Sequence, residues 1–255
     1  MRRSDVQLLK EIKNLLAFLT IIPVRMDMDC LTDSAKYMFL FPLIGALIGL
    51  LAGVFGWVVS QFLPSLVVGA LTLGFLLLIT GLHHTDGLLD FGDAIMYQGT
   101  AERKIEIMHD QFTGAGGLAF GIMTMLITAL CIAEISPGLL VPGLIAVEVS
   151  AKLSMVIEAW AGKAVHEGMG SSFIGAMHGR KGDYSVLAAL AISFAIAVPY
   201  FRLSGFITVT AGIIAALIML GVSQWHFKGV TGDVFGATNE LARMASLIAL
   251  LAIIR

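Results

Sequence analysis

Residues 66–93 read LVVGALTLGFLLLIT followed by GLHHTDGLLDFGD, and the fold is best read from the border between these two halves. Residues 66–80 carry no charged side chain and have the composition of a membrane span. The second half then introduces Asp86, Asp90 and Asp93 at i, i+4 and i+7. On a helix, these spacings place the three carboxylates on one narrow face. The stretch therefore predicts an apolar span that leads into an acid-bearing helix.

Three like charges on one helix face repel one another, which disfavours the helix unless a cation lies between them. Magnesium suits such a place because it binds carboxylate oxygens together with substrate phosphates. We therefore expect Asp86, Asp90 and Asp93 to hold Mg²⁺ in a reaction at a membrane surface. The alternative is a solvated helix end, at which the acids only mark the border with water.

The composition is that of a membrane protein. Of the 255 residues, 58% are hydrophobic and 13% are charged, whereas roughly a quarter are charged in a typical soluble domain. The net charge of −2 gives no sign of a nucleic-acid partner. Cys30 and Cys131 lie far apart, in contexts that suit neither a disulfide framework nor a zinc site. The expected partner is thus the lipid bilayer.

Apolar runs near the length of about 20 residues that crosses a membrane recur along the chain. We expect about seven spans and an all-α, polytopic transmembrane bundle that forms one domain over residues 1–255. The expected spans are residues 37–62, 66–82, 118–135, 139–160, 186–201, 206–222 and 237–254. Residues 1–24 predict an amphipathic segment on the membrane surface, with Lys10 and Lys13 on its polar side.

The distribution of basic residues predicts the orientation. With a cytoplasmic N-terminus, the cytoplasmic segments are residues 1–36, 83–117, 161–185 and 223–236, and they hold 12 of the 16 lysines and arginines. This bias follows the positive-inside rule. The same topology gathers the polar motifs on one side, so we expect a single site that faces the cytoplasm at the cell membrane.

A second acidic pattern lies in residues 101–110, AERKIEIMHD. Glu102, Glu106 and Asp110 recur every four residues, with Arg103 and Lys104 on a different side. Together with the aspartates before it, this segment predicts an acidic helical hairpin that could hold two metals, or a metal and a base. The alternative is an ordinary charged stripe on a surface helix.

Glycine-rich segments supply candidate phosphate contacts. In residues 113–117, TGAGG, the backbone at Gly114 and Gly117 could approach phosphate oxygens, although small residues near spans usually serve packing. Residues 166–183 add glycines, hydroxyls and the cations Arg180 and Lys181, which suit a phosphorylated ligand or simply a basic loop. The first span carries glycines that predict helix packing: Gly45, Gly49 and Gly53.

Two further patterns concern the later spans. The turn Thr231-Gly232-Asp233 directly precedes the last span and is typical of a ligand-holding loop. In the fourth span, Glu148 and Lys152 stand at i, i+4, where they can neutralise each other as a structural pair.

Taken in order, these blocks resemble the cobalamin synthase family, the adenosylcobinamide-GDP ribazoletransferases of bacteria and archaea. The likeness spans nearly the whole chain, and four positions depart from the family pattern: Ala94, His109, Gln111 and Phe112. The blocks are FLTIIPV with FPLIGALIG, HHTDGLLDFGDA, EIMHDQFTGAGG, and GSSFIG with GVTGDVFGATNE.

The resemblance implies a membrane transferase that joins adenosylcobinamide-GDP to α-ribazole, or to its 5′-phosphate, with release of GMP. The predicted nucleophile is the 5′ hydroxyl of α-ribazole. Asp233 would complete the magnesium site of Asp86, Asp90 and Asp93, while Glu106 or Asp110 would add a ligand or accept the hydroxyl proton. The predicted substrate contacts are His84, Gly114, Gly117, Arg180, Lys181, Thr231 and Gly232.

Two other functions compete with this one. A CDP-alcohol phosphotransferase also uses aspartates on membrane helices, but Asp86-Gly87 lacks the arginine expected after it. An ion-coupled secondary transporter could use Asp86 and Glu148, yet the chain has no inverted repeat. Whether copies assemble into a homo-oligomer is left open.

Overall fold

The computed structural model describes residues 3–23 and 34–254, and helices make up most of this part of the chain. The predicted all-α class is confirmed, because the described residues contain no β-strand and only a single parallel bridge, between Ala164 and Val230. The helices in chain order are α1 (Arg3–Leu19), η2 (Ala35–Leu40), α3 (Phe41–Val59), α4 (Ser65–Ile79), α5 (His83–Met96), α6 (Ala101–Met108), α7 (Ala115–Ala133), η3 (Pro137–Leu139), α8 (Leu140–Ala161), α9 (Met169–Met177), α10 (Arg180–Phe201), α11 (Leu203–Phe227) and α12 (Gly232–Ile254).

Among the described residues, six helical segments are long and apolar enough to cross a membrane, and a seventh results if α4 and α5 form one broken span. The six are η2 with α3, α7, η3 with α8, α10, α11 and α12. This confirms the expected number of spans and a multi-pass membrane protein. The predicted span 66–82 is corrected, because α4 ends at Ile79 and the chain bends by 98° into α5. The 15 residues of α4 reach only about 22 Å, which is shorter than a hydrocarbon core of about 30 Å.

Several helices extend beyond the apolar runs that predicted them. The expected span 186–201 belongs to a helix that starts at Arg180, and the span 206–222 belongs to one that ends at Phe227. The predicted cytoplasmic segment 83–117 is itself mostly helical, since it contains α5 and α6. Hydropathy marks only the apolar part of a helix, whereas backbone hydrogen bonding continues into polar turns.

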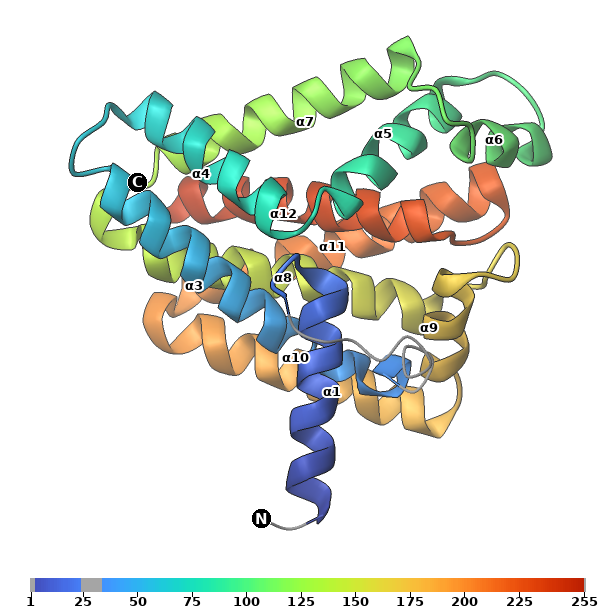
Figure 1. The fold of residues 1–255 in the computed structure, drawn as a ribbon, viewed down its shortest axis with the longest axis horizontal. Helices are drawn as coiled ribbons and strands as arrows, with labels where there is room; N and C mark the ends of the chain where they lie inside the picture. Colours follow the sequence, from blue (N-terminus) through green and yellow to red (C-terminus); the bar gives the residue numbers. More distant parts are fainter. Residues whose placement is uncertain (1–2, 24–33, 255) are drawn as a thin grey trace.

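The amphipathic pattern of α1 is confirmed by its packing. Leu15 and Leu19 are buried, whereas Lys10 and Lys13 are exposed. The ring of Phe18 stacks on Phe173 of α9 with centroids 5.1 Å apart. Figure 1 shows α1 crossing the long helices rather than running beside them. Its location on the membrane surface stays a prediction, and residues 1, 2 and 24 of the predicted segment lie outside the described residues.

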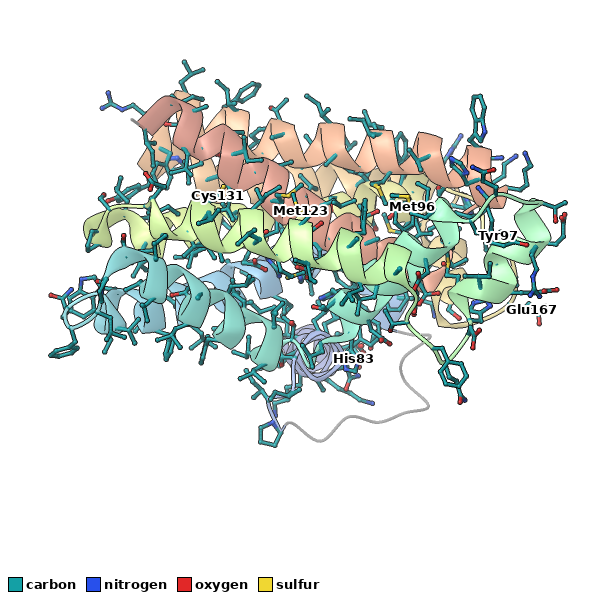
Figure 2. All side chains as sticks on the ribbon, turned by 90° about the horizontal axis from the view of Figure 1, so that it is seen from above. His83, Met96, Tyr97, Met123, Cys131 and Glu167 are labelled. Carbon is teal, nitrogen blue, oxygen red and sulfur yellow. The ribbon has the colours of Figure 1, made fainter. Side chains whose placement is uncertain are left out.

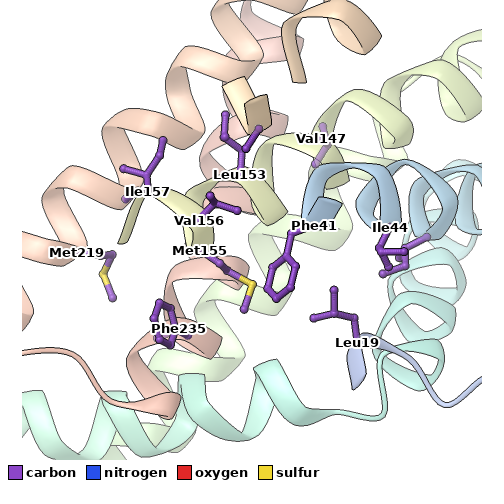
Figure 3. Close-up of a cluster of buried hydrophobic side chains, with 14 of the residues drawn as sticks. Leu19, Phe41, Ile44, Val147, Leu153, Met155, Val156, Ile157, Met219 and Phe235 are labelled. Carbon is purple, nitrogen blue, oxygen red and sulfur yellow. The ribbon is translucent and has the colours of Figure 1, made fainter. Parts of the chain in front are cut away.

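The helices α3 and α8 form the closest pair in the core. A Cβ atom on Gly45, Gly49 or Gly53 would collide with the backbone of α8, so the prediction that these glycines serve packing is confirmed. Figure 3 shows Phe41 of α3 beside Met155 of α8 in the buried apolar cluster around this contact. Close packing of this kind supplies the van der Waals attraction that holds membrane helices together.

Charged side chains join α8 to α12 inside the bundle. Arg243 forms ion pairs with both Glu148 and Glu240, and Lys152 donates a hydrogen bond to Asn239 Oδ1 over 2.5 Å. Lys152 also lies 3.9 Å from Glu148, which confirms the predicted pair as part of a larger network. All five side chains are at most 1% exposed. The two acids and two bases balance, as buried charges must in a low-dielectric interior.

Candidate active site

One end of the bundle collects the polar segments that the sequence singled out. Figure 1 shows α5, α6 and α9 at this end, together with the N-terminal ends of α7, α10 and α12. The segments after α8 and before α12 meet there through the bridge between Ala164 and Val230. Figure 2 shows Tyr97 and Glu167 at this end, and Cys131 toward the other. Segments 83–117, 161–185 and 223–236 thus lie at the same end of the bundle in the described residues, and the side of the membrane that this end faces stays a prediction.

A sharp bend before α5 sets the direction of this helix and of the aspartates that it carries. Gly81 and Leu82 both have left-handed backbone, with φ of 65° and 62°, and α5 begins directly after them. Asp86 lies in the first turn of α5 and is exposed, a position at which the helix dipole favours a negative charge. The predicted helical face is therefore present, because Asp90 follows on α5 one turn later.

Asp90 lies in a cluster of negative charge. It is partly buried, and the charged groups that act on it are Asp86, Asp233 and Asp93, all of them acidic. The side chain of Asp233, from the other end of the chain, is 28% exposed. In the described residues, no lysine or arginine forms an ion pair with these four carboxylates. The cluster thus includes Asp233 and has no ion-paired lysine or arginine, and its role in holding a metal stays a prediction.

Asp93 has a local role that the sequence did not predict. The N–H group of Gly114 donates to Asp93 Oδ2 over 2.6 Å, and the N–H group of Gly117 donates to Oδ1 over 2.8 Å. The carboxylate therefore caps the N-terminus of α7, where backbone amides have no partner within the helix. The amides of Gly114 and Gly117 point to this side chain, which contradicts the expectation that they meet phosphate oxygens.

The turn before α12 is built by Thr231. Its hydroxyl accepts a hydrogen bond from the N–H group of Val234 over 3.3 Å, as an N-terminal cap does. The same hydroxyl lies 3.2 Å from the sulfur of Met108 in α6 and 3.5 Å from Asp233 Oδ2. Thr231 is only 2% exposed, whereas Gly232 is exposed and borders open space. The geometry gives Thr231 a positioning role and leaves Gly232 accessible to a ligand.

The second acidic stripe is only partly as expected. Glu106 pairs with Arg103 across one turn over 2.5 Å, and both side chains are more than half exposed. Asp110 lies beyond the end of α6 at Met108, so it does not extend a helical face. The expectation that Arg103 lies on a different side from these acids was wrong, because i, i+3 neighbours on a helix come into contact. At the start of α6, hydrogen bonds from its own backbone N–H and the Thr100 hydroxyl lower the pKa of Glu102.

Two histidines near the cluster were not predicted as site residues. His109 Nε2 lies 3.8 Å from Asp233 Oδ2, and the ring of His109 meets that of His166 at a centroid distance of 4.9 Å. His84, which was predicted to contact substrate, is instead 6% exposed, and its Nδ1 has no hydrogen-bond partner among the described residues. The signal that could have found the pair is the presence of histidines in both converging segments, His109 in 83–117 and His166 in 161–185.

The predicted basic contacts stand at the start of α10. Arg180 and Lys181 are both exposed in its first turn. The nearby helix α9 begins against the turn before α12, where a Cβ on Gly170 would lie 3.1 Å from the backbone nitrogen of Gly232. No described ion pair joins Arg180 or Lys181 to the acidic cluster, so their charges remain available to an anionic ligand.

The donor set fits magnesium that is shared with a substrate. Within the described ranges, no three His, Cys, Asp or Glu side chains form a group that could hold a metal by themselves, which argues against the closed cage of four aspartates. Magnesium keeps several waters and typically takes one or two carboxylates plus substrate phosphates. Asp86, Asp90 and Asp233 offer such oxygens in a cluster without an ion-paired lysine or arginine.

Comparison with known proteins identifies the family. A model of cobalamin-5-phosphate synthases matches residues 11–251. The chain belongs to the cobalamin-5-phosphate synthase family. An adenosylcobinamide-GDP ribazoletransferase of Methanocella arvoryzae is 36% identical over an alignment 260 residues long. The alignment covers 94% of this chain and 94% of that protein. The adenosylcobinamide-GDP ribazoletransferase of Methanococcoides burtonii is 32% identical over 247 residues. This alignment covers 91% of this chain and 88% of that protein. No solved structure matches this chain.

Membership in the cobalamin-5-phosphate synthase family confirms the resemblance drawn from the sequence blocks. The matched region runs from α1 almost to the end of α12 and includes every element at the candidate active site. The family assignment therefore applies to the acidic cluster as well as to the membrane spans.

Proposed function

We propose that the protein transfers the adenosylcobinamide phosphate group from adenosylcobinamide-GDP to α-ribazole or α-ribazole 5′-phosphate. A hydroxyl oxygen forms a bond to the phosphorus next to cobinamide, the phosphoanhydride bond to GMP breaks, and the hydroxyl proton is released. The 5′ oxygen of the phosphorylated acceptor is already esterified, so a ribose ring hydroxyl is the nucleophile that both acceptors share. The proposed nucleophile is therefore a ring hydroxyl and not the 5′ hydroxyl. The family match and the names of the relatives favour this transferase over an alcohol phosphotransferase or a transporter.

The observation that carries this proposal is the cluster of like charges contributed by α5 and α12. Asp86, Asp90 and Asp233 would hold Mg²⁺ together with diphosphate oxygens of the substrate. Bound there, the ion would neutralise charge on the diphosphate, as phosphoryl transfer requires. Asp93 is assigned to the cap of α7 rather than to the metal.

Other residues of the chain bind and orient the reactants. Asp110 is exposed beside His109 and is the preferred acceptor for the hydroxyl proton, because Glu106 is engaged by Arg103. Arg180 and Lys181 supply positive charge for the phosphate groups of the nucleotide. We place this site on the cytoplasmic face of the cell membrane, supported by the basic residues that gather in the same segments.

The test is release of GMP by purified protein in detergent. Adenosylcobinamide-GDP and α-ribazole with Mg²⁺ should give GMP and the joined corrinoid, and chelation by EDTA should stop the reaction until Mg²⁺ is restored. Asp86→Asn should lose at least about a hundredfold in turnover, on the scale of losing one electrostatic contact to the transition state. The matched control is Glu167→Gln, an exposed acid at the same end outside the cluster, which should keep wild-type turnover. Full activity of Asp86→Asn would refute the site, and absence of GMP release would refute the function.

A further inference from the structure

The helices that carry the acids, α5 and α12, touch each other through two glycines. A Cβ on Gly87 would lie 2.8 Å from the carbonyl oxygen of Asp233 and 2.9 Å from its Cα. A Cβ on Gly236 would lie 3.0 Å from the carbonyl oxygen of His84 and 3.3 Å from the Cα of Gly87. No side chain can separate the helices here, so the two backbones are in direct contact.

This contact lies at the level of the acidic cluster. Gly87 directly follows Asp86, and it touches Asp233 itself. Aspartate has a short side chain, so a displacement of the backbone moves its carboxylate by a similar amount. Magnesium binds oxygens at 2.0–2.1 Å and calcium at 2.3–2.6 Å, so a difference of a few tenths of an ångström separates the two ions.

An added methyl group at this contact would displace α5 rather than α12. The central helix α12 is fixed to α8 by the buried ion pairs of Arg243 with Glu148 and by the hydrogen bond from Lys152 to Asn239. Helix α5 is shorter than α12 and lies between a backbone bend and a turn. Separation of the acids is therefore the expected response.

We propose that Gly87 and Gly236 are positioning residues that set the separation between Asp233 and the acids of α5, and thereby the size of the cation that these acids share. The inference rests on the magnesium site proposed above. It assigns a role to the spacing of two helix backbones and not to any further ligand.

The experiment measures metal binding directly. Mn²⁺ is titrated into the purified full-length protein in detergent, its electron paramagnetic resonance signal reports the bound fraction, and Mg²⁺ or Ca²⁺ is added as a competitor. In Gly236→Ala, Mg²⁺ affinity should fall by about tenfold, the lower end of the loss seen when groups that orient metal ligands are altered, while Ca²⁺ affinity falls less, so the ratio shifts toward Ca²⁺. Gly87→Ala tests the same displacement from the other helix, so the result does not depend on one variant.

The matched control is Gly74→Ala in α4, where an added Cβ meets nothing within 4 Å. This variant should keep the wild-type ratio of affinities. An unchanged ratio in folded Gly236→Ala and Gly87→Ala would overturn the inference. If wild-type protein itself bound no Mn²⁺, the proposed metal site would fail first, so the two failures are distinguishable.

A rescue variant separates positioning from general damage. Asp86→Glu places the carboxylate one methylene farther from its own backbone, which can close a widened gap. The double variant Gly236→Ala with Asp86→Glu should recover part of the Mg²⁺ affinity that each single variant loses. A loss in the double variant equal to the sum of the single losses would contradict the proposal.

Discussion

Asp90 has the surroundings that most favour binding of a cation, because other carboxylates surround it. It shares its neighbourhood with Asp86, Asp93 and Asp233, and it is partly removed from water. Repulsion between such groups destabilises the protein in the absence of metal, a cost that binding sites often carry for function.

The first prediction at this scale is that Asp90→Asn stabilises the metal-free protein while it abolishes turnover. Removing one of several like charges should raise the free energy of unfolding by about 0.5 kcal/mol, on the scale of like-charge pairs one helix turn apart. Thermal unfolding in EDTA and GMP release in Mg²⁺ provide the two measurements. A variant that is both less stable and fully active would contradict the assignment.

The second prediction concerns Asp93, whose carboxylate caps α7. Asp93→Ala should cost about 1–2 kcal/mol in free energy of unfolding, as the loss of an N-terminal cap does. Hydrogen exchange at the amides of Gly114 and Gly117 should become faster, because both donate to this side chain. Protection equal to that of the wild-type protein would show that the cap does not hold the helix.

At the scale of elements, the pairing of α8 with α12 fixes the helix that presents Asp233. The contact combines apolar packing with four charges that have no access to water. Removing one partner of a buried ion pair leaves the other charge uncompensated, which is more damaging than removing both.

The third prediction is a double-mutant cycle in this network. Arg243→Met should destabilise the protein by about 3–5 kcal/mol, because Glu148 and Glu240 then face only Lys152. The double variant Arg243→Met with Glu148→Gln restores charge balance and should be more stable than Arg243→Met alone. Thermal unfolding of the four proteins in detergent gives the coupling, and additive losses would exclude a shared network.

At the scale of the whole molecule, the polar segments converge at one end while the turn between α3 and α4 lies at the other (Figure 1). Segments 83–117, 161–185 and 223–236 at the first end carry basic residues, and on this ground we propose that this end faces the cytoplasm. The acidic cluster then opens to the compartment that holds the basic segments.

The fourth prediction tests this orientation with single cysteines, after replacement of Cys30 and Cys131. Glu167→Cys lies at the end with the candidate site and Gln61→Cys in the exposed turn between α3 and α4. A membrane-impermeant maleimide should label Gln61→Cys in intact cells, and Glu167→Cys only after the membrane is opened. Labelling of Glu167→Cys in intact cells would place the site outside.

The sequence by itself determined the features that depend on local order. Apolar runs gave the number of spans, because transfer into a membrane depends on composition over about 20 residues. The spacing of Asp86 and Asp90 gave a helical face, because helix periodicity needs only neighbours in the chain. The ordered blocks gave the family. Each of these signals is read without knowing which helices touch.

Only the tertiary structure decided which groups meet. Asp93 turned out to cap α7, Glu106 to pair with Arg103, and His109 to approach Asp233. Neither hydropathy nor residue spacing indicates which residue of a distant helix a side chain will contact. The contact of Gly87 with Asp233 joins residues 146 positions apart, and it exists because two backbones without side chains can approach closely. The separation of the acids is therefore a property of helix packing and not of the local sequence.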